Sequence, residues 1–163
     1  MDQGLTIPTK LKEVKRFWHL VDVKDKTLGR IASTIAVLLM GKSKPYFVRN
    51  LDCGDYVVVI NAKDVKVTGK KETLKKYYNY SGYPGGLTIE AMGDLRKRKP
   101  EKIIHHAVSG MLPQNKLQDR MLVRLFVFKG EEHSYKDKFE ARNPKSETNS
   151  NDQNTKSKTV LSI

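Results

Sequence analysis

The sequence predicts an α/β domain, because a strand, a helix and a second strand follow one another in its first half. Residues 17–23 are apolar, aromatic and β-branched, as in a strand. Residues 28–39 carry apolar side chains at helical spacing, with Thr27 as a candidate cap and Gly41 as a stop signal. Residues 55–61 are apolar without alternation, which is typical of a central strand covered on both faces. Two such strands joined by a crossover of about thirty residues form a βαβ unit, which is characteristic of α/β domains.

The later elements are predicted from shorter patterns. Pro100 is expected in the first turn of a helix, because backbone N–H groups there have no acceptor within the helix and proline lacks an N–H. In chain order, the patterns predict a short strand at 65–67, a loop at 82–86, helices at 88–97, 100–111 and 117–124, and a last strand at 125–128 that ends at Gly130.

Three segments are expected along the chain: an N-terminal extension at 1–16, a folded domain at 17–133 and a polar C-terminal extension at 134–163. The last segment is rich in Lys, Asn, Ser, Glu and Asp, so it is expected to bury too little apolar surface to order itself. Residues 1–16 show neither the apolar stretch of a secretion signal nor the pattern of a cleaved transit peptide. We therefore expect flexible extensions around one folded domain.

The charge balance predicts a polyanionic partner. Lys and Arg number 31 against 18 Asp and Glu, a net charge of +13, which favours nucleic acid, an anionic membrane or an acidic protein. The longest apolar run, 56–60, is far shorter than the roughly 18 residues of a membrane span, so we expect no membrane partner. Cys53 is the single cysteine, which excludes an intrachain disulfide and favours a reducing or organellar interior.

The segment 70–86 is the strongest local signal for RNA binding, because basic and aromatic residues alternate in it. Lysines neutralise phosphates, tyrosine rings stack on unpaired bases, and glycines let the backbone approach closely. A solvated charge run beside core tyrosines is the alternative interpretation. The candidate RNA-binding residues here are Lys70, Lys71, Lys75, Lys76, Tyr80, Ser81, Gly82, Tyr83 and Gly85.

Three further basic clusters are weaker candidates. Lys42, Lys44 and Arg49 follow the first helix, and the Gly-Lys-Ser run there is not a P-loop, because Ala36 stands where a glycine is required. The run 96–99 with Lys102 lies at a helix start and is equally well read as a solvated end. The third cluster has a spacing of four, which predicts one helix face. It consists of Lys116, Arg120 and Arg124.

Catalytic interpretations are weak. His105 and His106 are adjacent, so on a helix they point about 100° apart and cannot share a metal as an i, i+4 pair can. Asp52, Cys53 and Asp55 have no evident base nearby and are interpreted as structural. A nucleotide-dependent α/β enzyme is allowed by fold class alone, but no glycine-rich loop joins a strand to a helix. We expect no enzyme, no metal, no cofactor and no small-molecule substrate.

Seven motifs, in order, resemble the large-subunit ribosomal protein L13 family over residues 17–133. They are Trp18-His19-Leu20-Val21-Asp22, Thr27-Leu28-Gly29-Arg30-Ile31-Ala32, Gly41-Lys42 with Lys44-Pro45, Asp52 with Gly54-Asp55, Val67-Thr68-Gly69-Lys70-Lys71, Ser81-Gly82-Tyr83-Pro84-Gly85-Gly86 and Val108-Ser109-Gly110-Met111-Leu112-Pro113. The resemblance implies a three-layer α/β/α domain with a mostly parallel four-stranded sheet. It also implies a structural protein that binds large-subunit rRNA early in assembly, beside neighbouring ribosomal proteins and without a cofactor.

Two departures from the usual bacterial pattern bear on location. Cys53 stands where threonine is common, and the chain continues for thirty residues past His133. Both features look more like mitochondrial members of the family, so we expect the mitochondrial large ribosomal subunit, with the bacterial cytoplasm or a plastid as the alternative. The alternative function is an extra-ribosomal translational regulator that binds messenger RNA, because the same basic surface would serve both.

Overall fold

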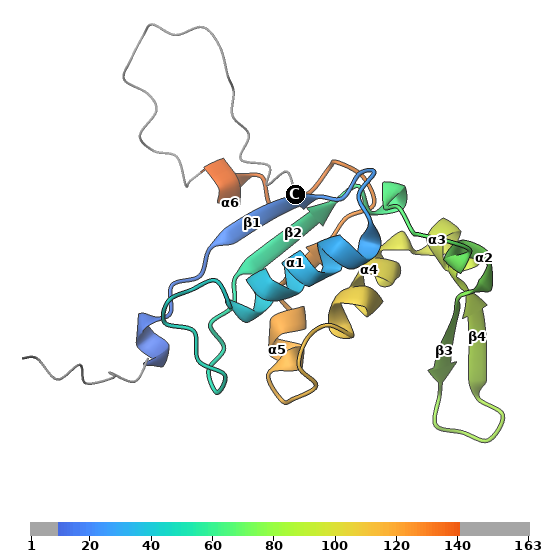
Figure 1. Ribbon diagram of the computed structural model, residues 1–163, viewed down its shortest axis with the longest axis horizontal. Helices are drawn as coiled ribbons and strands as arrows, with labels where there is room; N and C mark the ends of the chain where they lie inside the picture. Colours follow the sequence, from blue (N-terminus) through green and yellow to red (C-terminus); the bar gives the residue numbers. More distant parts are fainter. Residues whose placement is uncertain (1–9, 141–163) are drawn as a thin grey trace, which may run out of the picture.

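A three-stranded parallel sheet lies at the centre of the body. The computed structural model describes residues 10–140. Its strands β1 (Trp18–Asp22), β2 (Tyr56–Ile60) and β5 (Leu125–Val127) are arranged in the order β1-β2-β5. Figure 1 shows β1 and β2 side by side. The side chains of Val57 and Val59 are fully buried on one face of β2, and that of Val58 on the other. This confirms the prediction that the apolar, non-alternating segment is a central strand.

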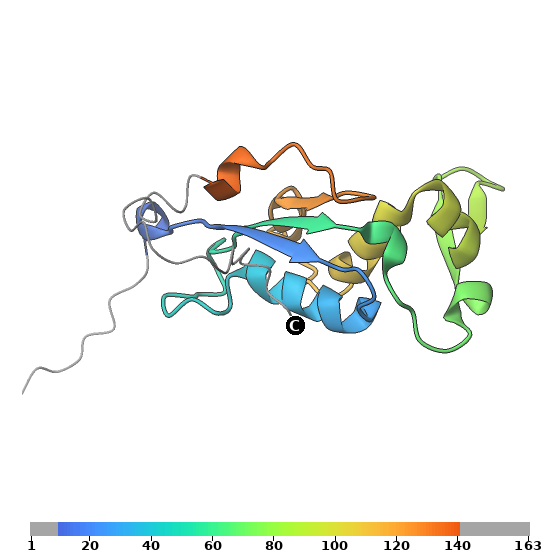
Figure 2. The ribbon, with the colours of Figure 1, turned by 90° about the horizontal axis from the view of Figure 1, so that it is seen from above.

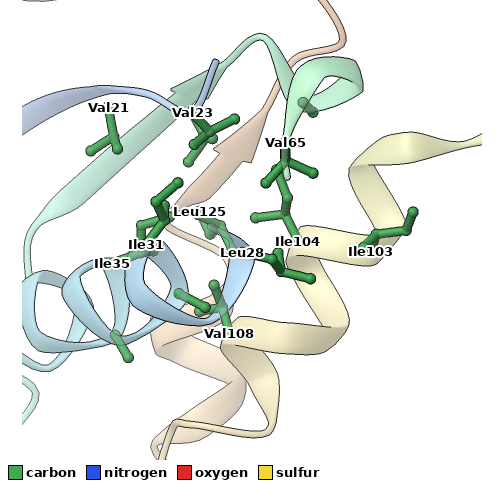
Figure 3. Close-up of a cluster of buried hydrophobic side chains, with 14 of the residues drawn as sticks. Val21, Val23, Leu28, Ile31, Ile35, Val65, Ile103, Ile104, Val108 and Leu125 are labelled. Atoms are coloured by element: carbon green, nitrogen blue, oxygen red, sulfur yellow. The ribbon is translucent and has the colours of Figure 1, made fainter. Parts of the chain in front are cut away.

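Two helices cover one face of this sheet. Helix α1 (Leu28–Met40) and helix α4 (Pro100–Ser109) lie side by side there (Figure 2). Helix α1 ends at Gly41, whose φ of 73° belongs to the left-handed region that glycine adopts at little cost. The core between helices and sheet is aliphatic (Figure 3), and each such side chain stabilises the fold by about 1.5–3 kcal/mol through burial. Its members include Val21, Val23, Leu28, Ile31, Ile35, Val65, Ile103, Ile104, Val108 and Leu125.

The other elements are short. They are the 3-10 turns η1 (Leu11–Glu13) and η2 (Ala62–Asp64) and the helices α2 (Lys71–Leu74), α3 (Met92–Arg98), α5 (Gln118–Leu122) and α6 (Asp137–Glu140). Helix α6 lies on the opposite face of the sheet from α1 (Figure 2).

Aromatic side chains cover that second face. Trp18 stacks on Tyr56 with ring centroids 4.4 Å apart and on Phe126 at 5.9 Å. The ring of Tyr135 lies 5.3 Å from Trp18 and 4.5 Å from Phe126, and Phe139 meets Trp18 edge-on. Packing on the sheet therefore extends to Phe139, past the boundary expected at residue 133, because two aromatic residues there supply apolar surface. The rest of the expected extensions, at 1–9 and 141–163, lies outside the described residues.

A two-stranded antiparallel hairpin projects from one end of the body (Figure 1). Strand β3 (Lys76–Tyr80) pairs with β4 (Leu87–Ala91), and residues 81–86 form the turn. The predicted helix at 88–97 is therefore wrong in its first half, since helix α3 begins only at Met92. The β-branched pair Thr88-Ile89 suits a strand, and pairing with β3 decides its conformation.

The sheets also correct the strand count. The resemblance implied four mostly parallel strands in three layers, whereas the described residues form three parallel strands and a separate antiparallel pair. The strand expected at 65–67 makes one isolated bridge, from Lys66 to Thr27. The α/β class is confirmed.

Candidate nucleic-acid interface

The hairpin and the residues before it present lysines that have no acidic partner. Lys70, Lys71, Lys75 and Lys76 are exposed, and no carboxylate within residues 10–140 lies within 4.0 Å of their ammonium groups. Two acids of α2 and β4 pair with arginines of α3.

These acids are Glu72 and Glu90. Glu72 lies 3.0 Å from Nε of Arg96, and Glu90 pairs with Arg98. Because the acids already have partners in α3, the positive charge of the lysines faces solvent uncompensated. This arrangement suits a surface that attracts phosphates.

Strand alternation gives the hairpin an inner and an outer face. Tyr77 points inward and is half-buried, and its ring stacks on His106 at 5.2 Å. Burial raises the pKa of Tyr77, and the positive charge of Arg96 opposes that rise only partly. The neighbouring Tyr78 and Tyr80 point outward and are exposed. The inner face attaches the hairpin to the body, and the outer face remains open.

The tip of the hairpin carries four of the residues predicted to bind RNA. Ser81, Gly82, Tyr83 and Gly85 are all exposed. Gly82 and Gly85 have φ values of 90° and 74°, which only glycine adopts easily, so both shape the turn. The backbone N–H of Ser81 donates to the carbonyl of Gly86 at 3.1 Å and closes the loop.

The basic cluster after α1 divides into exposed and buried members. Lys42 and Arg49 are exposed. The side chain of Lys44 is only 8% exposed, and its ammonium donates to the carbonyls of Lys15 (2.7 Å) and Cys53 (2.8 Å) and to Asp55 (2.5 Å). The donors of Lys44 are therefore engaged within the fold.

The predicted stripe of three cations on one helix is not present. Helix α5 ends at Leu122, so Lys116 precedes it and Arg124 follows it. Lys116 and Arg120 are exposed, but Arg124 is only 5% exposed. Its two terminal nitrogens each donate to one carboxylate oxygen of Asp52, both at 2.5 Å. Arg124 is separated from the exposed cations because its guanidinium compensates a buried carboxylate.

Asp52 and Asp55 are the acids at the centre of this buried network, and the sequence analysis interpreted both as structural residues. Burial raises the pKa of Asp52, but the hydrogen bond and charge of Arg124, with the charge of Arg16, outweigh it and leave the pKa below its ordinary value. Burial likewise opposes ionisation of Asp55, and hydrogen bonds from His19 and Lys44 lower its pKa overall. Two acids directly before a buried strand were a signal that buried cations must exist nearby.

Close packing explains the glycine between these two acids. A Cβ on Gly54 would lie 1.7 Å from the carbonyl oxygen of Leu39, at the end of α1. The loop therefore runs against the helix end, where the Asp52–Arg124 pair also lies. Of the exposed candidates, Lys42 and Arg49 belong to the segment that connects α1 to this loop.

Within residues 10–140, no three His, Cys, Asp or Glu side chains are grouped as metal ligands would be. None of the described helices has the length and apolarity needed to cross a membrane.

Comparisons with known proteins agree on one family. The family model for ribosomal protein L13 matches residues 16–134. The chain is 52% identical over 130 residues to the large ribosomal subunit protein uL13 of Dehalococcoides mccartyi strain 195, covering 80% of this chain and 91% of the relative. It is 49% identical over 140 residues to the uL13 protein of Dictyoglomus thermophilum, covering 86% and 96%. It is 51% identical to that of Prochlorococcus marinus strain MIT 9301, covering 80% and 91%.

Proposed function

We infer that this chain, which belongs to the ribosomal protein L13 family, is a structural constituent of the large ribosomal subunit. We propose further that it binds large-subunit rRNA through its exposed cations and its hairpin. The observation that carries this proposal is the group of four exposed lysines at 70–76 without acidic partners. The proposed contact residues are Lys42, Arg49, Lys70, Lys71, Lys75, Lys76, Tyr80, Ser81, Gly82, Tyr83, Gly85, Lys116 and Arg120.

Binding would be mainly electrostatic. Each lysine that neutralises a phosphate releases a condensed counterion, so affinity falls as salt concentration rises. Phosphate contacts fix the position of a protein on RNA without reading sequence, and specificity then follows from the shape of the folded RNA. Lys44 and Arg124 would support this surface indirectly, by holding the loop at 41–55 against the sheet.

The proposed partners are large-subunit rRNA and neighbouring ribosomal proteins, and the proposed role includes support of subunit assembly. The relatives described above are bacterial, which fits a ribosome of a bacterium or of an organelle. Within that range we propose the mitochondrial large subunit, on the basis of Cys53 and the thirty residues after His133.

Gradient sedimentation of a gentle cell and organelle lysate tests the assignment. The chain is expected to migrate with large-subunit rRNA of one compartment and to leave it in high salt or without magnesium. A peak that sediments slowly and contains no large-subunit rRNA would contradict the assignment and favour the messenger-RNA regulator. Co-migration with the bacterial or plastid subunit instead would overturn only the mitochondrial location.

A quadruple variant tests the binding surface. Replacing Lys70, Lys71, Lys75 and Lys76 by alanine is expected to lower affinity for an rRNA transcript and to reduce the slope of log affinity against log salt by about 3, since each contact to single-stranded RNA contributes roughly 0.7. The matched control removes four exposed lysines elsewhere and is expected to change the slope little. These control residues are Lys12, Lys24, Lys63 and Lys136. Equal slopes for both variants would assign the binding to another surface.

A further inference from the structure

The outer face of the hairpin is a small aromatic and aliphatic platform. Lys76, Tyr78 and Tyr80 alternate along β3 and so share this face. The register places Ile89 directly opposite Tyr78 and Leu87 opposite Tyr80, and directly opposed residues of an antiparallel pair also share a face. The platform therefore consists of two tyrosine rings, each with an aliphatic neighbour, and a lysine at one end.

This platform is open to solvent in the described structure. Tyr78 and Tyr80 are 66% and 62% exposed, and Leu87 and Ile89 are 54% and 52% exposed. The opposite face holds the hairpin on the body through the contact of Tyr77 with His106 and the pair of Glu90 with Arg98. Contiguous exposed apolar patches commonly mark interaction sites, whereas single exposed apolar residues do not. We therefore expect the outer face to bind a partner.

The charges around the platform identify the chemistry of that partner. Lys76 lies in the same row as the two tyrosines, and Lys75 precedes it. The strand acid Glu90 lies on the other face and is neutralised by Arg98. An occupant must therefore combine flat apolar surfaces with negative charge. An unpaired RNA strand does so, since its base faces are apolar and its backbone carries phosphates.

The geometry of the strand suits two consecutive bases. Residues two apart on a strand lie about 7 Å from one another on one face, and sheets that bind single-stranded RNA present aromatic rings that stack two or three bases. In a duplex, each base face is covered by stacking on the neighbouring base pairs. The platform therefore favours unpaired nucleotides over helical RNA.

We propose that Tyr78 and Tyr80 each stack one unpaired rRNA nucleotide, with Ile89 and Leu87 flanking the bases and Lys76 contacting a phosphate. This deepens the proposed rRNA binding and rests on it. It adds Tyr78, which the sequence pattern did not distinguish from Tyr77, and it names the RNA class that the hairpin takes. Register, exposure and charge on one face carry the assignment.

The test compares two double variants of the full chain: Tyr78→Leu with Tyr80→Leu, and Tyr78→Phe with Tyr80→Phe. The probes are an rRNA transcript, a single strand of about twelve nucleotides and the same strand annealed to its complement. The leucine variant keeps apolar bulk but cannot stack, so its affinity for the single strand is expected to fall at least about tenfold with an unchanged salt slope. The phenylalanine variant is expected to keep wild-type affinity, and duplex binding is expected to change little in either variant.

Three outcomes would overturn stacking on this face. The first is equal affinity of the leucine variant and the wild type for the single strand, while both still bind the rRNA transcript. The second is an equal loss of affinity for single strand and duplex. The third is a leucine variant that binds RNA normally but is lost from washed large subunits, which would assign the face to a neighbouring protein. A wild-type chain that binds no rRNA at all would instead remove the proposed function, and unchanged circular dichroism would exclude misfolding of the variants.

Discussion

Two cations beside the sheet of the body, Lys44 and Arg124, are buried and paired, whereas the lysines of the segment 70–76 are exposed and have no ion pair. Arg124 and Lys44 meet Asp52 and Asp55 at 2.5 Å in a region that solvent barely reaches. The lysines at 70–76 are exposed, and no carboxylate within residues 10–140 lies within 4.0 Å of their ammonium groups. Net charge alone therefore does not identify the residues that meet RNA, because part of it stabilises the fold. The two regions should respond differently to substitution.

The largest expected effect on stability comes from breaking the buried pair. Asp52→Ala leaves the guanidinium of Arg124 buried without its partner and is expected to lower the free energy of unfolding by about 3–5 kcal/mol. The control is Lys66→Ala, which removes the exposed pair of Lys66 with Asp25 at 3.0 Å and should cost less than about 1 kcal/mol. Urea denaturation measures both, and similar losses would show that burial does not distinguish the two pairs.

The aromatic cover of the sheet should give a smaller effect. Tyr135→Ala removes a ring that contacts both Trp18 and Phe126 and is expected to cost about 2 kcal/mol of unfolding free energy. Tyr83→Ala removes an exposed ring at the hairpin tip and should leave the urea midpoint nearly unchanged. If the two variants unfold at the same urea concentration, residues 134–140 do not stabilise the body.

Acid should weaken the body through the same two carboxylates. The pKa values of Asp52 and Asp55 lie below their ordinary values in the folded state, so the unfolded chain binds more protons. Their contribution to stability is full above the unfolded pKa of about 4 and is lost as pH falls through the folded values. Asp52→Asn should flatten the dependence of the urea midpoint on pH between about 3 and 5, and an unflattened curve would assign acid sensitivity to other groups.

The smallest effect on stability is expected in the hairpin. Alanine at Lys70, Lys71, Lys75 and Lys76 removes side chains that contact no acid, so the free energy of unfolding should change by less than about 0.5 kcal/mol. Thermal and urea unfolding measure this directly. A loss of unfolding free energy comparable with that of Asp52→Ala would show that these lysines have a structural role. The two regions would then not differ in how their cations contribute to stability.

Local pattern predicted most of the body and little of the hairpin. The apolar run at 55–61 was sufficient to predict a buried strand. The helical spacing at 28–39 was sufficient to predict a helix with one buried face. Residues 88–97 combine a strand with a helix, and the strand forms only through pairing with β3, which no local pattern contains. The strand at 76–80 was missed for the same reason.

Within the candidate site, the solvent exposure of each basic side chain was harder to predict from the sequence than the location of the basic clusters. Lys42 and Lys44 look alike in sequence, yet only Lys44 lies within reach of Asp55. Arg124 pairs with a residue 72 positions away, so its spacing of four from Arg120 predicted a stripe of cations that does not form. Composition predicted a basic protein. It did not predict which cations are exposed, because that depends on which acids the folded backbone brings close to them.

Trp18 is the only tryptophan in the chain, and it lies beneath Tyr135 and beside Phe139. The molecule thus carries one built-in optical probe, at the place where residues 134–140 meet the sheet. Indole emission shifts to longer wavelength when water reaches the ring, and RNA contains no indole. The wavelength of that emission would therefore show whether residues 134–140 stay packed on the sheet while the protein binds an rRNA transcript, without any label being added.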